Sequence, residues 1–267
     1  MSQRYIFDNA APQAGTRFSG LEAAYDEVTT GYLTNLGVAP GWRCWEIGAG
    51  NGSVARWLAE RVGPTGSVLA TDVNTDWIET SGLTNLEVRH HDVVVDELPT
   101  PAFDLIHARL VMTHLPTRED VLLRLVQALK PGGVLLIEDF DPVGIPPCPL
   151  PTTDRERTYV LVHAALLQLF EKYRGKTDWG RTLPWRFRNS GLADVGANGT
   201  MKFVTGGSAG ASVARANLLQ VGDELVSEGL ATRADVDTYI AATDDPDLLF
   251  AMPIFVSAWG RRPSDRA

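Results

Sequence analysis

Apolar and polar positions along this chain follow two periods, one typical of helices and one typical of buried strands. Short apolar runs bounded by turn signals predict strands at 42–47, 67–71, 85–91, 103–108 and 134–137. Apolar residues at helical spacing predict helices at 20–36, 52–62, 118–130, 155–173 and 181–191. Strands that alternate with helices in this way indicate an α/β fold with a parallel, doubly wound sheet.

The pattern changes character after the strand at 134–137. Residues 142–151 hold five prolines in ten residues, which predicts a rigid, irregular connection. Beyond the next helices we expect an edge strand at 194–204, two short helices within 208–242 and a closing strand at 252–259. The resulting division is an N-terminal arm and helix acting as a lid (1–36), a Rossmann-like core (37–141), a helical cap insertion for the substrate (142–191), and closing strands and helices (192–267).

The composition of the chain argues against several classes of function. The 267 residues carry a formal net charge of −9, which argues against a surface for nucleic acid, so we expect no nucleic-acid partner. The two cysteines form no metal-binding pattern and favour a reducing compartment. No apolar run reaches signal or membrane-span length, so the sequence predicts a cytoplasmic protein with no membrane partner.

The stretch Trp45–Ser53 carries the strongest chemical signal. Gly48, Gly50 and Gly52 follow an apolar run and open a helix, and glycines there let backbone N–H groups approach a ligand closely. Their spacing is GxGxG, whereas the dinucleotide fingerprint places its third glycine one residue later. Glu46 at the mouth of this turn would repel a pyrophosphate and attract a cation. S-adenosylmethionine, with a sulfonium and an ammonium, fits this pattern.

Asp72 ends the strand at 67–71, one strand-helix-strand unit after Glu46. Ligands of parallel α/β sheets lie beyond the carboxyl ends of the strands, so this carboxylate is placed to accept hydrogen bonds from a ribose diol. The alternative is that Asp72 caps the start of a helix.

Six motifs occur in order along residues 20–140, and each falls at a predicted strand end or turn. They are Glu46–Gly52, Thr71–Val73, His91–Asp92, Phe103–His107, His114–Pro116 and Leu129–Gly133. As a set they resemble the motifs of class I S-adenosylmethionine-dependent methyltransferases of the small-molecule or secondary-metabolite type. The resemblance implies a Rossmann-like, seven-stranded sheet of order 3-2-1-4-5-7-6, with strand seven antiparallel.

The resemblance also implies roles for individual residues. The three glycines approach the methionine and ribose parts of the cofactor, and Asp72 takes both ribose hydroxyls. Asp92 accepts from the adenine amino group while the Val93 N–H donates to the ring. The remaining residues of the implied cofactor site are Glu46, which lies behind the residues that contact the cofactor, Val73, and Arg109, which lies near the methionine carboxylate. Alternatives are that Asp92 forms a turn and that Glu46 is a structural carboxylate.

His114 is the candidate catalytic residue. It follows the fourth strand near the expected methyl group, and a neutral imidazole there could take a proton from a phenol or an activated carbon. The alternative is a histidine that satisfies a helix start or packs under the cofactor. Glu138, Asp139 and Asp141 cluster after strand five without an acidic partner after strand four, so we expect no metal.

Aromatic residues in the insertion and the N-terminal arm indicate the acceptor class. Tyr159, Phe170, Tyr173, Trp179 and Trp185 lie in or beside the insertion, and pockets for uncharged small molecules are mainly apolar. We predict a hydrophobic small-molecule acceptor methylated at oxygen or carbon. Two alternatives are a S-adenosylmethionine-binding protein without transfer activity and a nicotinamide oxidoreductase, although no Tyr-x-x-x-Lys pair exists. A homodimer is left open.

Overall fold

The computed structural model describes residue 7 and residues 11–99, 103–142, 147–148, 150–174 and 177–264. The chain divides into two compact units. The sheet unit comprises residues 26–140, 179–199 and 255–267, and the helical unit comprises residues 1–25, 141–178 and 200–254. Each unit is formed by segments far apart in the sequence.

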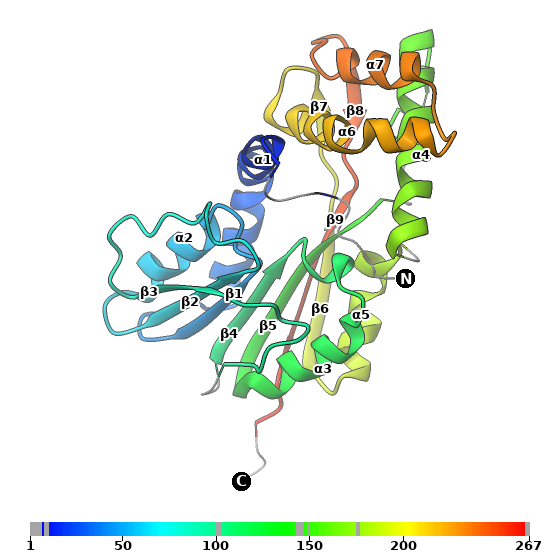
Figure 1. Ribbon diagram of the computed structural model, residues 1–267. Coiled ribbons are helices and arrows are strands. Elements are labelled where there is room, and N and C mark those ends of the chain that lie inside the picture. The colour runs from blue at the N-terminus through cyan, green and yellow to red at the C-terminus, as the bar shows by residue number, and fades with distance from the viewer. Residues whose placement is uncertain are drawn as a thin grey trace. The chain divides into compact units, whose positions relative to one another are not determined.

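A seven-stranded sheet forms the centre of the sheet unit (Figure 1). Its order is β3-β2-β1-β4-β5-β9-β6, with β9 antiparallel, which confirms the predicted fold class and strand order. The inner strands β1, β2, β4 and β5 bury residues on both faces, because both faces of a parallel sheet are covered. The strands are β1 Arg43–Ile47, β2 Ser67–Asp72, β3 Leu86–His90, β4 Phe103–Arg109, β5 Leu129–Asp141, β6 Ala193–Thr200 and β9 Ile254–Arg261.

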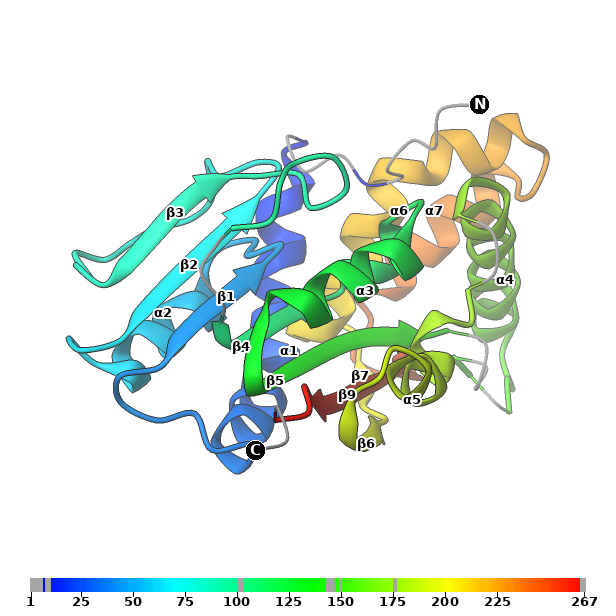
Figure 2. The ribbon, with the colours of Figure 1, turned by 90° about the horizontal axis from the view of Figure 1, so that it is seen from below.

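Helices cover both faces of this sheet (Figure 2). On one face, α1 (Gln13–Asn35) and α2 (Ser53–Val62) pack through Leu33 and Leu58 onto Leu105 and Leu136. On the other face, α3 (Arg118–Ala128) and α5 (Trp179–Asn189) pack onto inward residues such as Ile137. A short 3₁₀ turn, η1 (Met112–His114), follows β4 on this second face. Alternate residues of each strand therefore serve two separate apolar layers.

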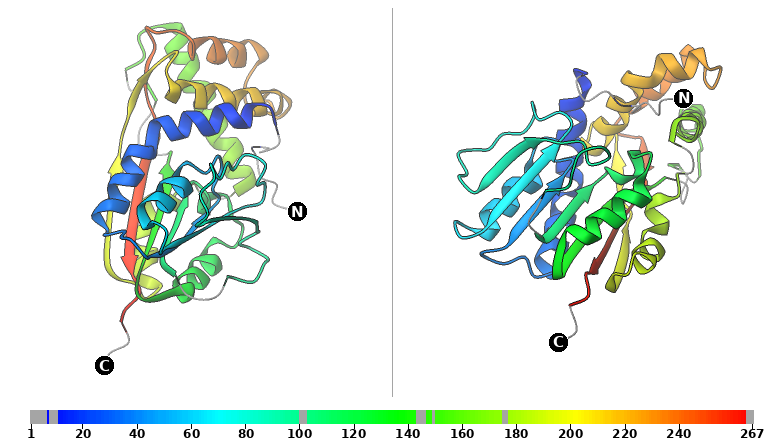
Figure 3. Two further views of the ribbon diagram at one scale, coloured as in Figure 1. Left: turned by 90° about the vertical axis from the view of Figure 1, so that its left-hand side faces the viewer. Right: turned by 60° about the horizontal axis from the view of Figure 1, so that its bottom comes forward.

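The helical unit is built from α4 (Asp154–Arg174), α6 (Ala209–Ser227) and α7 (Arg233–Ala242), with the antiparallel pair β7 (Phe203–Thr205) and β8 (Leu249–Ala251) (Figure 3). Tyr159 of α4 stacks on Tyr239 of α7 with ring centroids 4.0 Å apart. The first half of α1 packs closely on α6, because a Cβ on Gly20 would lie 2.7 Å from the Ala209 carbonyl oxygen. Gly20 is therefore a packing residue, and it does not start the helix.

Several boundaries differ from the predicted ones. Helix α1 begins at Gln13, seven residues before the predicted start. The predicted closing strand at 252–259 corresponds to β9, which begins after Pro253, at Ile254, and ends at Arg261. The predicted edge strand at 194–204 is two strands, β6 and β7, in different sheets. The two units also differ from the predicted division. Helix α5, predicted in the cap insertion, belongs to the sheet unit, whereas α6 and α7 belong to the helical unit with residues 141–178.

Most of the N-terminal arm lies outside the described residues, and its role as a lid stays a prediction. Of its first ten residues only Phe7 is described. Phe7 is buried, and its ring meets that of Phe170 edge to face at 5.4 Å. This contact belongs to the helical unit and shows that part of the arm packs against α4.

Because the core has two apolar layers, we expect that truncating a central side chain of β5 lowers the stability of the sheet unit. Leu135 is fully buried opposite Ile106, so Leu135→Ala should lower the free energy of unfolding by about 2–5 kcal/mol. Leu123→Ala on the exposed side of α3 is the matched control, since Leu123 is 48% exposed. Urea unfolding of both variants measures the difference, and equal losses would contradict this description of the core.

Candidate functional site

The glycine turn between β1 and α2 is bound to the end of β2. Gly48, Gly50 and Gly52 have φ angles of +65°, +56° and +80°, in the region that favours glycine. The Gly48 N–H donates to the Thr71 carbonyl at 2.7 Å, and the Gly50 N–H donates to Asp72 Oδ2 at 3.0 Å. The structure thus brings together the glycines and the carboxylate that the sequence predicted as neighbours.

Two of these glycines are also required by the packing of the chain itself. A Cβ on Gly48 would lie 2.2 Å from Val111 Cγ2, and a Cβ on Gly52 would lie 2.9 Å from Ile78 Cγ2. Between them, Asn51 Oδ1 is buried and has no hydrogen-bond partner among the described residues. A buried acceptor without a donor is rare in proteins, so this atom is a candidate ligand contact.

Asp72 is the last residue of β2 and is 7% exposed. Its Oδ1 accepts from the Asn74 N–H at 3.0 Å. Burial raises the pKa of this carboxyl above its ordinary value, against the backbone N–H groups that lower it. Residues 73–85 form turns and extended chain with no helix, so the interpretation of Asp72 as a helix cap is wrong.

Asp92 follows β3 and is partly exposed, and its Oδ1 accepts from the Val94 N–H at 2.9 Å. This bond forms the turn that the alternative interpretation expected. The next side chain, Val93, is buried, whereas Val73 after β2 is 55% exposed. Asp92 therefore has a structural role whether or not it also contacts a ligand.

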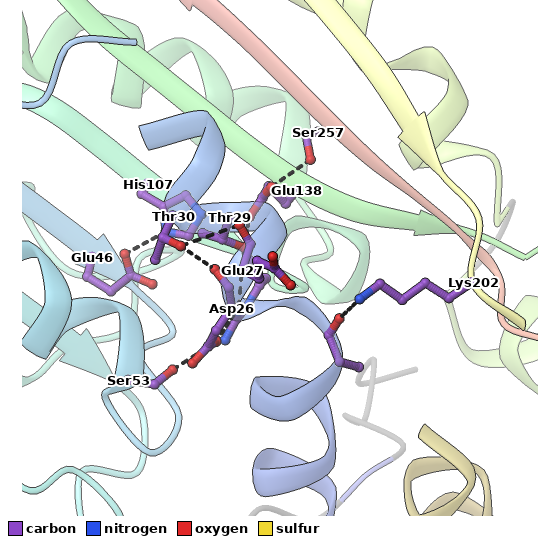
Figure 4. Close-up of polar contacts among 12 residues, drawn as sticks. Asp26, Glu27, Thr29, Thr30, Glu46, Ser53, His107, Glu138, Lys202 and Ser257 are labelled. Atoms are coloured by element: carbon purple, nitrogen blue, oxygen red, sulfur yellow. Dashed lines mark hydrogen bonds and ion pairs between the residues drawn. The ribbon is translucent and has the colours of Figure 1, made fainter. Parts of the chain in front are cut away.

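Glu46, His107 and Glu138 form a buried acidic network on the α1 face of the sheet (Figure 4). His107 Nδ1 lies 2.6 Å from Glu46 Oε2, and His107 Nε2 lies 3.2 Å from Glu138 Oε2. Hydroxyls of Thr29 on α1 and Ser257 on β9 donate to the Glu138 carboxylate at 2.5 and 2.6 Å. The network joins four elements of the sheet unit besides β5.

Charge balance within the network favours a protonated imidazole. Burial by itself would lower the pKa of His107, but the Glu46 and Glu138 carboxylates outweigh burial and raise it to about 9. Burial would likewise raise the pKa of Glu138, and His107 with the two hydroxyls lowers it instead. Glu46 was predicted to lie behind the residues that contact the cofactor. Its carboxylate faces His107.

Arg109 at the end of β4 is paired with the first helix. Its Nη1 donates to Asp26 Oδ1 at 2.8 Å and to the Thr29 hydroxyl at 3.3 Å, and the Ser53 hydroxyl donates to the same Asp26 oxygen at 3.1 Å (Figure 4). Asp26 thus connects α1, α2 and β4. Asp26 and Thr29 were not among the predicted site residues. Their three-residue spacing on a predicted amphipathic helix puts them on one face and was the available signal.

His114 ends the η1 turn and is partly exposed. Its N–H donates to the Val111 carbonyl at 2.9 Å, and the preceding Thr113 N–H donates to Asp139 Oδ2 at 3.2 Å. The turn that carries the candidate base is therefore held by the end of β5. Among the described residues, no three His, Cys, Asp or Glu side chains are grouped to hold a metal ion.

Comparison with known proteins agrees with this geometry. A family model for a methyltransferase domain matches residues 45–135, which run from the glycine turn to β5. Together with the strand order, this match supports the resemblance of residues 45–135 to the class I S-adenosylmethionine-dependent methyltransferases. No helix within the described ranges has the length and apolar character needed to cross a bilayer.

Two of the proteins similar to this chain are named as methyltransferases. The chain is 31% identical over 149 residues to the ubiquinone/menaquinone biosynthesis C-methyltransferase UbiE of Ectopseudomonas mendocina, covering 48% of this chain and 58% of that protein. It is 39% identical over 112 residues to methyltransferase str2 of Strobilurus tenacellus, covering 41% of this chain and 39% of that protein. The matched segments thus span about half the length of the UbiE relatives.

Among solved structures, the fold is similar to that of phosphoethanolamine N-methyltransferase 2 from Haemonchus contortus, bound to phosphomonomethylethanolamine and S-adenosylhomocysteine. The TM-score is 0.60 at 16% identity, over 99% of this chain and 61% of that chain. At this identity the likeness shows a shared fold.

The buried imidazolium predicts a specific pH dependence of stability. A histidine whose pKa rises from 6.5 unfolded to about 9 folded stabilises the protein fully below pH 6.5, and this contribution is lost as the pH rises to 9. His107→Gln should therefore be much less stable than wild type below pH 6.5, and the difference should shrink above pH 9. Urea unfolding across this range measures it. His90→Gln, at an exposed position, is the control, and a pH-independent difference for His107→Gln would contradict the protonated state.

Proposed function

We propose that this chain transfers the methyl group of S-adenosylmethionine to an oxygen or carbon atom of a hydrophobic small molecule. The observation that carries the proposal is the hydrogen bond between the Gly50 N–H and Asp72 Oδ2, which fixes a glycine turn beside a carboxylate at adjacent strand ends. This is the edge of a parallel sheet at which ligands bind.

The residues at this edge fit the cofactor. A carboxylate offers about four acceptor positions, and those on Asp72 that do not bind N–H groups of the chain are assigned to the ribose hydroxyls. The buried Asn51 Oδ1, which has no partner within the described ranges, can accept from the α-ammonium. Both contacts need hydrogen-bond donors, and S-adenosylmethionine presents donors at both its ribose and its ammonium.

Each neighbouring residue receives a role from its position. Asp92 and the Val93 N–H take the adenine edge, and Val73, exposed after β2, lies beside it. The guanidinium of Arg109 has five N–H donors, and those not bound to Asp26 or Thr29 are assigned to the methionine carboxylate. Glu46 pairs with His107 of β4, and this pair positions the end of β1, which precedes Gly48.

Bound S-adenosylmethionine supplies an electrophilic methyl group on a sulfonium. The chain has to orient the acceptor in line with that methyl group and exclude water, and His114 takes the proton that the acceptor releases. The name of the UbiE relatives supports an organic small-molecule acceptor and carbon as the methylated atom, and the name of the Strobilurus relative supports methyl transfer.

Titration calorimetry and product analysis test the proposal. The purified protein should bind S-adenosylmethionine and not NADH, and it should form S-adenosylhomocysteine when hydroxylated aromatic or quinone-type compounds are added. Binding without product for every acceptor would favour the S-adenosylmethionine-binding protein without transfer activity. Binding of NADH in place of S-adenosylmethionine would favour the oxidoreductase.

Asp72→Ala tests the ribose contact. The substitution leaves two ribose hydroxyls without their acceptor in a desolvated site, so S-adenosylmethionine binding should weaken by about 1–3 kcal/mol. Asp76→Ala is the matched control, because Asp76 is an exposed acid four residues away. An affinity of Asp72→Ala within a factor of two of the control would remove Asp72 from the site.

His114→Ala tests the proton acceptor. If His114 is the base, turnover should fall by roughly 10²–10⁴ while S-adenosylmethionine affinity stays nearly unchanged. Asp237→Ala, at an exposed position of α7, serves as the control in the same assay. A loss of turnover below tenfold would favour catalysis by positioning alone, and parallel loss of binding and folding would favour a structural role.

A further inference from the structure

The loop that follows β3, residues 92–97, is closed by hydrogen bonds among its own groups. The Asp92 N–H donates to Asp96 Oδ2 at 2.8 Å, and the Val94 N–H donates to Asp92 Oδ1 at 2.9 Å. The N–H groups of Val95 and Asp96 both donate to the Asp92 carbonyl, at 3.2 and 2.9 Å. None of these bonds uses the N–H of Val93. Within residues 92–96, the loop therefore leaves this one N–H for another partner.

A single side chain of α3 binds the carbonyl groups of the same loop. Arg124 Nη1 donates to the Val93 carbonyl at 3.0 Å and to the Val94 carbonyl at 3.1 Å, and Nη2 donates to the Asp96 carbonyl at 2.5 Å. The side chain is half-buried. A guanidinium is planar and presents its donors in a rigid fork, so three such bonds fix the loop more closely than one bond would.

The start of the loop is attached to the proposed cofactor site. The His91 N–H donates to the Asp72 carbonyl at 3.0 Å, so the loop leaves the sheet beside the carboxylate assigned to the ribose. His91 is buried, and its ring meets that of Trp45 edge to face at 5.7 Å. His91 Nε2 also lies 3.1 Å from the Glu97 carbonyl oxygen. Both ends of the loop are thus held by His91, and its middle is held by Arg124.

These bonds separate the polar groups of the loop into two sets. The carbonyl groups of Val93, Val94 and Asp96 are bound to Arg124. The Val93 N–H remains as a donor, and Asp92 has a second carboxylate oxygen besides the Oδ1 that accepts from Val94. Adjacent donor and acceptor groups match the edge of adenine, whose amino group donates and whose ring nitrogen accepts.

We propose that Arg124 is a positioning residue of the cofactor site, which holds the Val93 N–H and the Asp92 carboxylate in the arrangement that selects adenine. The proposal rests on the proposed function, which assigns the adenine edge to Asp92 and Val93. Arg124 acts through the three carbonyl groups of the loop. Because these bonds set the loop conformation before the cofactor binds, less ordering is needed on binding.

Two ligands that differ at the purine edge isolate this effect. The protein is titrated with S-adenosylhomocysteine and with S-inosylhomocysteine, in which an oxygen replaces the amino group and the neighbouring ring nitrogen carries a hydrogen. Wild type should bind S-adenosylhomocysteine more tightly, because the second ligand reverses the donor and the acceptor. Arg124→Met, which removes the guanidinium and keeps an unbranched stem, should weaken S-adenosylhomocysteine roughly tenfold and leave S-inosylhomocysteine nearly unchanged.

Two further variants complete the comparison. Arg188→Met removes the same charge from an exposed position of α5 and should behave as wild type. Arg124→Lys keeps the charge but donates from one nitrogen atom, and it should weaken S-adenosylhomocysteine about threefold. If Arg124→Met does not fold, Arg124→Lys decides the question, since a loss confined to S-adenosylhomocysteine supports the proposal and equal losses for both ligands contradict it.

Amide hydrogen exchange of the ligand-free protein measures the loop directly. The N–H groups of Val94, Val95 and Asp96 should exchange faster in Arg124→Met than in wild type, because the carbonyl bonds that hold the loop closed are lost. Arg188→Met should show the exchange rates of wild type.

The outcomes distinguish this proposal from the proposed function. Equal affinities of wild type for the two ligands, equal losses for both in Arg124→Met, or exchange rates unaffected by this substitution would overturn the role of Arg124. Failure of wild type to bind S-adenosylmethionine or S-adenosylhomocysteine would overturn the proposed function instead, and the exchange rates would still decide whether Arg124 holds the loop.

Discussion

The hydrogen-bonded charges of Glu46, His107 and Glu138 are the constraint on which the rest of the sheet unit depends. Three ionisable groups are fully removed from water on adjacent strands, and such a set is tolerable only when every charge is paired. One imidazolium between two carboxylates, with hydroxyls from Thr29 and Ser257, satisfies this condition. The pairing fixes the lateral register of β1, β4 and β5 and ties α1 and β9 to them. Removing His107 would leave two buried carboxylates without a cation.

The glycine turn depends on that register. Glu46 pairs with His107 two residues before Gly48, and the turn then bonds to the Thr71 carbonyl and the Asp72 carboxylate on the next strand. Asp26 adds a contact from α1 to Arg109 and Ser53 on the same side. The turn is therefore held in its conformation before any ligand binds, and a preorganised site of this kind loses little freedom on binding.

Much of this architecture could be predicted from the sequence because it depends on local signals. Alternating strand and helix patterns with glycine stops were enough for the sheet, and its strand order followed from the resemblance carried by the motifs. The placement of Asp72 beside Gly50 followed from the rule that parallel strands end at one edge. Contacts between side chains of helices and strands far apart in the sequence could not be predicted. Asp26 pairs with a residue 83 positions away and Thr29 with one 109 positions away, and no periodicity encodes such partners.

The two acids at the end of β5 show how strand geometry divides these tasks. In sequence Glu138 and Asp139 look like one cluster, yet successive strand residues face opposite sides of the sheet. Glu138 joins the charged network on the α1 face, where His107 keeps its pKa low. Asp139 enters the apolar layer of α3 and α5, where burial keeps its pKa high. Two neighbouring acids of β5 thus have different surroundings, a hydrogen-bonded network with His107 on one face and the layer of α3 and α5 on the other.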